Sequence, residues 1–414
     1  MKKILPSIFC FIFLISLTTV NAQDIQRTGG QARIYSMGNN PYIIDPEFIK
    51  LNPAWASDYY NFLWGDIGSN AGTSFGDQSN GQFAGLNVRL NSRFTLGGLL
   101  TVNTANQFVT ISTLDPYGLV QSINNIVGPN RVVPLNNNFE AFGSYRYGSS
   151  TFGLGIAYAA TQNEIDIPVP IVQTQIGDAC QFGINAGILT RLTRDILLDV
   201  GASLIFPSVS YQSTNVPNTK LSQTIILVDA RSFINVSRRI TFVPLINLQS
   251  ASGSAEAGGQ SGDLPSTFNL GIGVGANYQI DDFLLAGGIG IDFNSIKYPS
   301  APNQSPQYTD SYVEFPVWNL GAEWFATKWL VARLGYMAST FNSTNETPIP
   351  ASLTQVQKTI ITSYAPGTVT LGIGLRFGDF SLDATVNSDV LRQGLNTIGG
   401  GGPTFAYIST SYAF

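Results

Sequence analysis

The sequence contains no histidine, the residue most often used as a general base and the commonest zinc ligand. Catalytic centres built on an imidazole are therefore excluded, no spacing of serine, lysine or carboxylate residues favours another mechanism, and no run resembles a calcium loop. Charged residues make up only 11% of the chain, and the net charge of −5 offers no basic face for a nucleic acid. We expect a protein that is not an enzyme and that binds neither a metal, a cofactor nor a nucleic acid.

Cysteine and long apolar runs are almost absent. Cys10 falls within residues 1–22, which start with a basic pair, continue as an apolar run and end with Val20 and Ala22 at the small-residue positions of a signal-peptidase site. We expect these residues to form a cleaved signal peptide, so that Cys180 remains alone and no internal disulfide forms. After residue 22 no uninterrupted apolar run reaches the length of about 18 residues that a transmembrane helix needs.

The chain is instead rich in glycine, with 42 residues, and in aromatic residues, at 12%. Its apolar side chains alternate with small or polar ones, most regularly over residues 269–280. A period of two places the apolar side chains on one face of a β-strand. Low charge with abundant glycine suits strands that face hydrocarbon on one side and water on the other, so the pattern predicts an all-β fold, a transmembrane antiparallel β-barrel.

Short turns and polar connections divide this pattern into hairpins. Seven short turns are expected, at 91–93, 148–150, 193–195, 237–239, 281–282, 326–328 and 378–379. Long polar loops are expected near 103–137, 161–179, 207–222, 250–266, 295–310 and 339–365. An opening strand at about 59–67, which pairs with a closing strand at 404–414, brings the prediction to about sixteen strands, with fourteen as the alternative, in one barrel domain over residues 58–414. Trp324, Phe377 and Phe380 stand beside turns, as in an interfacial aromatic girdle.

Residues 23–57 precede the barrel and do not alternate. Within them, Asp45, Pro46 and Glu47 are typical of the start of a short helix, with an Asp cap, a proline at the first position and an acid in the first turn. That helix must end before Pro53. The triplet that contains this proline, Asn52–Pro53–Ala54, is either a simple helix stop or part of a longer motif.

The longer motif is the run Gln31–Asn40 (QARIYSMGNN), followed by Asp45 and by Asn52–Pro53–Ala54. It resembles the N-terminal signature of the FadL and PorV type outer-membrane barrels, in which the corresponding segment folds back into the barrel as a hatch. The resemblance implies an N-terminal plug over residues 23–57. Trp55 departs from it, because the family usually has glycine after Asn-Pro-Ala.

The resemblance also implies a place in the bacterial outer membrane, in contact with membrane lipid, with the N-terminus and the short turns on the periplasmic side. Three functions remain open. The first is passive uptake of apolar or weakly polar small molecules, as in FadL-like proteins. The second is a role in type IX protein secretion, as in PorV-like proteins, with secreted proteins as partners. The third is a general porin, against which a plug argues.

The last strand ends with two aromatic residues, Tyr412 and Phe414. They resemble the C-terminal signal that the barrel assembly machinery reads in bacterial outer-membrane proteins. We expect them to direct assembly.

The connection after the first hairpin is expected to contain a helix. Asp115 is a candidate cap, Pro116 suits the first turn, and Gly128 with Pro129 would end the helix. Five apolar residues fall on one helical face, at Leu119, Val120, Ile123, Ile126 and Val127. This face either forms an apolar entrance site at the barrel mouth for a hydrophobic small molecule or merely seals the rim against neighbouring loops.

Four charged residues share the inner face of successive strands near short turns, at Glu323, Arg333, Arg376 and Asp383. Opposite charges at similar distances from the short turns predict a network that cross-links neighbouring strands and holds the plug. The alternative is a constriction that selects solutes by charge.

Overall fold

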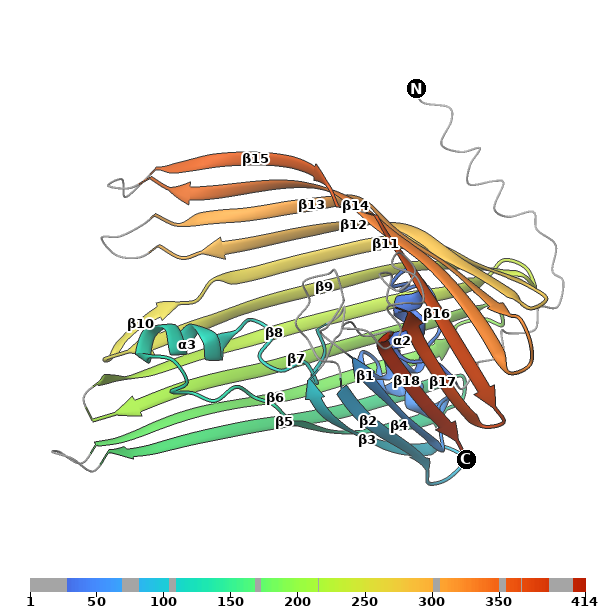
Figure 1. Cartoon of the computed structure of the whole chain (residues 1–414), viewed down its shortest axis with the longest axis horizontal. Helices are drawn as coiled ribbons and strands as arrows, with labels where there is room; N and C mark the ends of the chain where they lie inside the picture. The colour runs from blue at the N-terminus through green and yellow to red at the C-terminus, as the bar shows by residue number, and fades with distance from the viewer. Residues whose placement is uncertain are drawn as a thin grey trace, which may run out of the picture.

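The structure, a computed structural model, describes residues 28–68, 82–103, 109–167, 173–214, 216–300, 306–349, 355–365, 367–386 and 405–414. Within these ranges eighteen strands form one antiparallel sheet that closes on itself (Figure 1). The signal peptide predicted over residues 1–22 lies outside the described residues.

The strands are β1 (Phe62–Gly68), β2 (Gln82–Arg89), β3 (Phe94–Asn103), β4 (Asn138–Tyr147), β5 (Ser150–Ile167), β6 (Gln173–Arg191), β7 (Ile196–Ser213), β8 (Val216–Asn235), β9 (Ile240–Ala257), β10 (Gln260–Asp263), β11 (Ser266–Ile280), β12 (Phe283–Tyr298), β13 (Tyr308–Phe325), β14 (Leu330–Pro348), β15 (Val356–Tyr364), β16 (Thr368–Phe377), β17 (Phe380–Val386) and β18 (Phe405–Ala413). The helices of the described ranges are α2 (Gln31–Ser36), η1 (Pro46–Lys50), η2 (Pro53–Ser57) and α3 (Leu119–Val127). None of these helices has the length and hydropathy needed to cross a membrane.

Two passes of the chain along the barrel wall, which we call crossings, each consist of two consecutive strands. They are β10 with β11 and β15 with β16. β9 pairs with β11 through residues 240–251 and with β10 through residues 254–257. In the same way, β14 pairs with β16 through residues 330–337 and with β15 through residues 340–348. Counting β10 with β11 and β15 with β16 reduces the eighteen strands to sixteen crossings, so the predicted strand number is confirmed.

The first and last strands close the barrel, as predicted. β1 pairs antiparallel with β18 and places Phe62 opposite Ala413 and Ile67 opposite Ile408. Closure leaves no free edge in the lower part of the wall that all the strands share, which hydrocarbon requires because no water is present there to satisfy backbone groups. β1 begins slightly later than the predicted residue 59, because Asn61 has a positive φ of 48° that interrupts the extended chain.

Side chains alternate between a buried inner face and an exposed outer face that is largely apolar. On β11 and β12, Ile272 and Leu285 are both 45% exposed, whereas Asn277 and Ala286 on the opposite face are buried. The alternation predicted for residues 269–280, with apolar side chains on the outer face, is therefore confirmed. An apolar outer face is the wall of a barrel that spans a membrane.

Aromatic side chains gather on the outer face beside the short turns. The rings of Phe283 and Trp324 are stacked with centroids 5.5 Å apart, and Phe377 and Phe380 are exposed nearby on adjacent strands. Aromatic rings at this height are typical of the boundary between hydrocarbon and headgroups.

All seven predicted short turns connect neighbouring strands at one end of the barrel, on the right in Figure 1. At the other end, the loop end, most predicted boundaries are wrong, because the strands continue into residues expected to be loops. β5 and β6 stay paired as far as Ile167 and Gln173, and β7 and β8 as far as Ser213 and Val216. A strand that has left the hydrocarbon keeps its backbone ladder but no longer needs an apolar outer face. Polar composition therefore marked where the wall leaves the membrane and not where the strands end.

The wall is tall on one side and low on the other. β5–β9 and β11–β14 contain 15–20 residues each, whereas β1–β4 and β16–β18 contain 7–10. The expected long connection at 103–137 lies between β3 and β4 on the low side and carries α3, which lies at the loop end in Figure 1. The tall side thus provides an inner surface for α3.

Candidate functional site

Residues 28–61, which we call the luminal segment, lie inside the barrel toward the end with the short turns. Every side chain of η1 and η2 is buried, as are most of those of α2. Inward-facing glycines let the segment approach the wall on opposite sides. A Cβ added at Gly153 would lie 2.1 Å from the backbone nitrogen of Ala54, and one at Gly335 would lie 2.0 Å from that of Gly38. Both positions therefore require glycine for close approach of two backbones.

Two Asx-proline pairs set the path of the luminal segment. Asp45 accepts a hydrogen bond from the Glu47 nitrogen at 3.1 Å and starts η1, as predicted. Asn52 accepts one from the Ala54 nitrogen at 2.9 Å and starts η2. Asn52–Pro53–Ala54 is therefore not a simple helix stop, because the chain begins a second 3₁₀ helix there.

The wall holds the backbone of the luminal segment through inward-facing polar side chains. Ser409 Oγ accepts a hydrogen bond from the Ala32 nitrogen at 2.9 Å. Four asparagine amides donate to segment carbonyls at 2.8–3.2 Å, Asn319 to Gly38, Asn277 to Tyr42, Asn185 to Lys50 and Asn87 to Tyr59. These partners come from β18, β13, β11, β6 and β2, so the segment is bonded to the wall all the way round.

An alternating chain of buried charges links the luminal segment to β13, β14, β16 and β17. Arg33 contacts Asp45 at 3.1 Å and grips Glu323 with two nitrogens at 2.9 and 3.0 Å. Glu323 also lies 2.6 Å from Arg333, which lies 2.7 Å from Asp383. Asp383 in turn contacts Arg376 at 2.9 Å. Three guanidinium groups and three carboxylates thus alternate without an excess of either sign.

The charges in this chain keep Arg33 ionised. Burial alone would lower the pKa of its guanidinium, but the carboxylates of Glu323 and Asp45 raise that pKa above its ordinary value. A buried charge that lost its partner would be left in a medium of low dielectric, which is strongly unfavourable. The chain therefore acts as a unit.

A second polar cluster anchors the luminal segment on the opposite wall. Asp199 on β7 accepts hydrogen bonds from Asn52 Nδ2 at 2.7 Å and from Trp55 Nε1 at 3.0 Å. Arg231 on β8 lies 2.6 Å from the same carboxylate, and its guanidinium carbon lies 3.6 Å from the centre of the Phe48 ring. Trp55 stands where the resembled family usually has glycine. Its indole packs against Phe233 and donates a hydrogen bond to the Asp199 carboxylate.

A third buried pair completes the ring of anchors. Lys50 Nζ lies 2.7 Å from Glu47 Oε2 and 3.5 Å from the centre of the Phe83 ring, and Lys50 is only 2% exposed. The Asp66 carboxylate accepts from the Gln31 nitrogen at 3.2 Å. Charged contacts thus reach the low side of the wall as well.

At the loop end, α3 packs on the inner face of the tall wall. Leu119, Val120 and Ile123 are buried against Val209 and Leu221 and their neighbours on β5–β8. Val127 is partly buried in the same cluster, but Ile126 is 64% exposed. Ile126 is therefore wrongly placed in the predicted face, since it lies in the last turn and at the edge of the stripe.

The start of α3 also differs from the prediction. The helix begins at Leu119, after Gly118 with a positive φ of 69°, and Pro116 precedes it. Asp115 still caps the helix, since its two carboxylate oxygens accept from the nitrogens of Leu119 and Val120 at 2.7 and 2.9 Å. Burial raises the pKa of Asp115, and these two N–H groups act in the opposite direction.

Tyr117 extends from this loop to the part of the tall wall beside α3. Its hydroxyl accepts hydrogen bonds from Gln249 Nε2 at 2.5 Å and from Thr267 Oγ1 at 2.8 Å. Gln249 and Thr267 lie on β9 and β11, which follow β8 in the sheet, whereas α3 packs mainly on β5–β8. Tyr117 therefore extends the attachment of the loop along the inner face of the tall wall.

A cavity of about 300 Å³ lies in the lumen beside Val109. Its inward-facing polar lining includes three carboxylates and several amides, at Asp229, Asn247, Gln249, Asn269, Asp292, Asn294 and Glu314. Within the described part of the chain, no group of three or more Cys, Asp or Glu residues is arranged to hold a metal ion. The three carboxylates favour cations and hydrogen-bond donors over anions.

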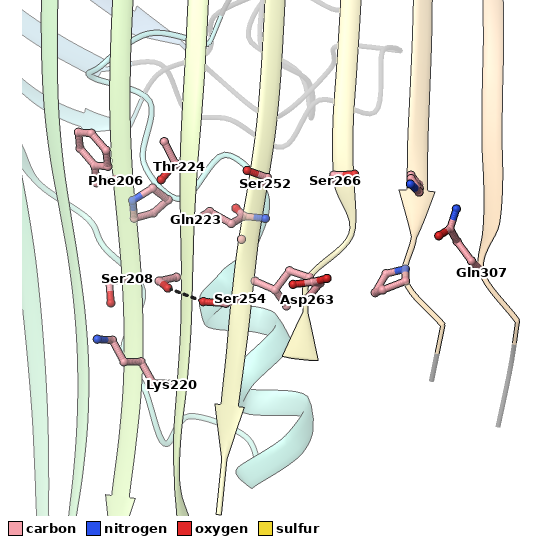
Figure 2. Close-up of a pocket in the computed structure, with 16 residues that line it drawn as sticks. Phe206, Ser208, Lys220, Gln223, Thr224, Ser252, Ser254, Asp263, Ser266 and Gln307 are labelled. Atoms are coloured by element: carbon pink, nitrogen blue, oxygen red, sulfur yellow. Dashed lines mark hydrogen bonds between the residues drawn. The ribbon is translucent and has the colours of Figure 1, made fainter. Parts of the chain in front are cut away.

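A larger hollow of about 760 Å³ lies on the outer face of the tall wall (Figure 2). Phe206, Thr224 and Ser252 line it and alternate along their strands with the buried, inward-facing Ile205 and Ala251. Figure 2 also shows Lys220, Ser254 and Asp263 at its border. Its hydroxyl-rich lining lies just beyond the apolar band.

The structure brings some candidate residues together and leaves others apart. Glu323, Arg333, Arg376 and Asp383 are joined by ion pairs, whereas α3 is far along the barrel from this network in Figure 1. Tyr412 and Phe414 are exposed on the outer face, with ring centroids 6.2 Å apart.

Sequence reasoning did not find Asp199, Arg231 or Tyr117. The inward-facing positions of Asp199 and Arg231 were available as a signal, but their partners in the luminal segment lie more than a hundred residues away. For Tyr117 no local signal existed, because its bonds depend on how the loop packs on the tall wall.

No family model and no curated protein matches the sequence. Solved structures with a similar chain path include a Pseudomonas aeruginosa FadL homologue, at 12% identity over 91% of this chain and 96% of that chain, with a TM-score of 0.42. The Pseudomonas putida toluene transporter TodX is similar at 10% identity over 94% of this chain and 97% of that chain, with a TM-score of 0.38. The FrpB iron transporter of Neisseria meningitidis matches at 10% identity and a TM-score of 0.40, and 78% of this chain spans only 60% of its length.

Proposed function

We propose that this protein is an outer-membrane channel for small apolar or weakly polar molecules, in which the luminal segment acts as a plug. The observation that carries the proposal is the change in the lumen along the barrel axis. The loop end is lined by apolar clusters, whereas the turn end is filled by a segment bonded to the wall on every side. A freely open porin would not need such a segment.

An uptake path follows from this arrangement. Ile111, Ile205 and Ile225 form a buried apolar cluster below α3, with Val109 packed against it. Val109 also borders the cavity lined by carboxylates and amides. A molecule with an apolar body would pass along the isoleucines and place a weakly polar end in the cavity, above the luminal segment.

The proposed orientation puts the short turns and the N-terminus in the periplasm and the tall wall outside the cell. Short turns on the periplasmic side and longer extensions outside are the usual arrangement of such barrels. The outward-facing Tyr412 and Phe414 are then available to the assembly machinery at the periplasmic end. Lipid contacts the apolar outer face.

Binding of a fluorescent fatty acid to the purified barrel tests the proposal. Ile123→Asp places a charge in the buried face of α3, and we expect it to weaken binding by about tenfold or more, because an unpaired buried carboxylate disrupts the cluster. Ile126→Asp is the matched control, since Ile126 is exposed on the same helix. Equal affinities of all three proteins would contradict the apolar entrance. Rapid swelling of proteoliposomes in sugar solutions would instead indicate a general porin.

A second candidate, a PorV-like role in protein secretion, is favoured by the polar upper wall. The strands of the tall side carry a hydroxyl-rich outer hollow large enough to receive a loop of another protein. Stable co-purification of exported proteins, lost when the hollow is altered by Ser254→Trp, would favour this role over uptake.

A further inference from the structure

Charge is unevenly distributed around the ring of short turns. Four consecutive short turns, those of β2–β3, β4–β5, β6–β7 and β8–β9, include every site of an exposed arginine among the described residues. Arg93 lies at the β2–β3 turn, Arg191 and Arg194 at the β6–β7 turn, and Arg238 and Arg239 at the β8–β9 turn, while the half-buried Arg146 stands beside the β4–β5 turn. Asp195 is the acidic residue within these turns. We call these four turns the arginine arc.

The other three turns have the opposite balance. They carry Asp281, Asp282 and Asp379 against Lys328, and all four side chains are exposed. The whole chain has a net charge of −5, so the arginine arc is not part of a general basic excess. One half of the rim is positive and the other half is negative.

The arginine arc is continuous in space. Its neighbouring turns are joined by backbone hydrogen bonds, from Arg146 nitrogen to the Arg93 carbonyl at 2.8 Å, from Arg191 nitrogen to the Ser149 carbonyl at 3.0 Å and from Asn235 nitrogen to the Asp195 carbonyl at 2.8 Å. Successive turns lie two strands apart, which is roughly 10 Å. This spacing is slightly more than the Debye length of about 8 Å at physiological salt, so the fields of neighbouring turns are partly screened there and add up more fully at low salt.

We propose that the arginine arc is a docking surface for an acidic protein on the side of the membrane that the short turns face. Guanidinium groups bind carboxylates through paired hydrogen bonds and are less strongly hydrated than ammonium groups, which suits a protein interface. Exposed apolar side chains lie among them, with Leu90 56% and Leu192 60% exposed. A mixed rim of arginine and apolar groups is typical of protein interfaces.

The asymmetry of the rim favours a protein over an anionic lipid surface. A bilayer surrounds a barrel evenly, so binding of lipid headgroups would place basic residues on all seven turns. Here two of the three remaining turns carry only acidic charge and would repel both phosphates and an acidic protein. A single acidic partner that approaches from one side of the rim accounts for both the basic half and the acidic half.

Poly-L-glutamate provides an acidic probe for the test. The barrel is placed in nanodiscs of zwitterionic phosphatidylcholine and titrated with the probe, and binding is followed by fluorescence anisotropy. We expect saturable binding that weakens with salt and falls by about tenfold in the triple variant Arg93→Gln/Arg194→Gln/Arg239→Gln. The corresponding Arg→Lys triple variant keeps the charge and should lose much less.

The matched control removes equal charge outside the arginine arc. Lys328→Gln/Lys358→Gln changes two exposed lysines, on the β13–β14 turn and on β15, and should leave the affinity within about twofold, whereas Arg93→Gln/Arg194→Gln, with the same change in charge, should weaken binding several-fold. An equal loss in the control would mean that net charge alone attracts the probe, which overturns the proposal. The proposal is also overturned if the wild-type barrel does not bind poly-L-glutamate but retains phosphatidylglycerol in native mass spectra, while the arginine variant retains none.

Discussion

The two ends of the lumen are held by different forces. At the turn end, the luminal segment is fixed by ion pairs and by asparagine amides that donate hydrogen bonds to its carbonyls. At the loop end, α3 is held mainly by apolar contacts with β5–β8. Directional bonds accept one geometry, whereas apolar contacts have no direction and tolerate small displacements. If the barrel opens, movement is therefore expected first in the loop around α3.

The free energy lost when one end of the lumen is disturbed also depends on whether polar or apolar contacts hold that end. A complete buried ion-pair network adds little net stability, because desolvation offsets the attraction between its charges. Removing one member is different, since its partners then remain charged and buried. The luminal segment is therefore expected to resist displacement even though its anchors are not strongly stabilising as pairs.

The largest effect is expected from Glu323→Ala. It leaves Arg33 without its bidentate partner and removes one of the two carboxylates of Arg333. We expect the free energy of unfolding to fall by about 3–5 kcal/mol, as for other broken buried pairs. Urea titration followed by tryptophan fluorescence measures the loss, and planar-bilayer recordings should show increased conductance as the luminal segment loosens.

Two controls separate this loss from a general effect of charge. Asp379→Ala removes an exposed acid near the same end and should change stability by no more than about 0.5 kcal/mol. The double variant Arg33→Met/Glu323→Leu replaces both charges with apolar groups and should be less destabilised than Glu323→Ala. A double variant as unstable as the single one would show that charge pairing is not the cause.

A somewhat smaller effect is expected at the other end from Ile123→Ala. Ile123 is fully buried between α3 and the tall wall, so truncation leaves a cavity and should cost about 2–4 kcal/mol. Ile126→Ala, on the exposed side of the same helix, should be nearly neutral. If both variants unfold at the same urea concentration, α3 is not a stable part of the wall.

The barrel could be predicted from local signals. Each hairpin depends on a period of two and a short turn, and both are visible within about ten residues of sequence. The same signals locate Glu323, Arg333, Arg376 and Asp383. Alternation along the strand decides which face of the wall a side chain occupies, and the number of residues from the turn decides its position along the barrel axis. Their ion pairs therefore lie within reach of sequence reasoning.

The contents of the lumen could not be predicted in this way. The luminal segment has no period, so nothing local indicates that Arg33 meets Glu323 or that Trp55 meets Asp199. The upper strands were missed for a different reason. Outside hydrocarbon a strand does not need an apolar face, so polar extensions such as 208–213 are indistinguishable from loops by composition.

Gly335→Ala tests the closeness of the luminal segment to the wall with a single methyl group. The added Cβ would lie 2.0 Å from the Gly38 nitrogen, so backbone must move, and we expect a loss of about 1–3 kcal/mol. Gly262→Ala on β10 has no heavy atom within 4 Å of the added Cβ and should be neutral. Comparable urea midpoints for the two variants would mean that the segment is displaced without strain, contrary to a fixed turn end.

The smallest change in stability, and the sharpest test of movement at the loop end, is expected from Tyr117→Phe. The variant keeps the ring and removes the hydroxyl that accepts from Gln249 and Thr267, so stability should fall by only about 1 kcal/mol. Because these bonds attach the loop of α3 to β9 and β11, their loss should loosen the loop and speed the binding of a fluorescent fatty acid in stopped-flow measurements while the equilibrium affinity changes little. Ser122→Ala is the control, since Ser122 is exposed on α3 and bonds only within the helix, to the Gly118 carbonyl. Unchanged association rates in Tyr117→Phe would show that the loop does not limit access, and the moving part of the barrel would then have to be sought in the luminal segment.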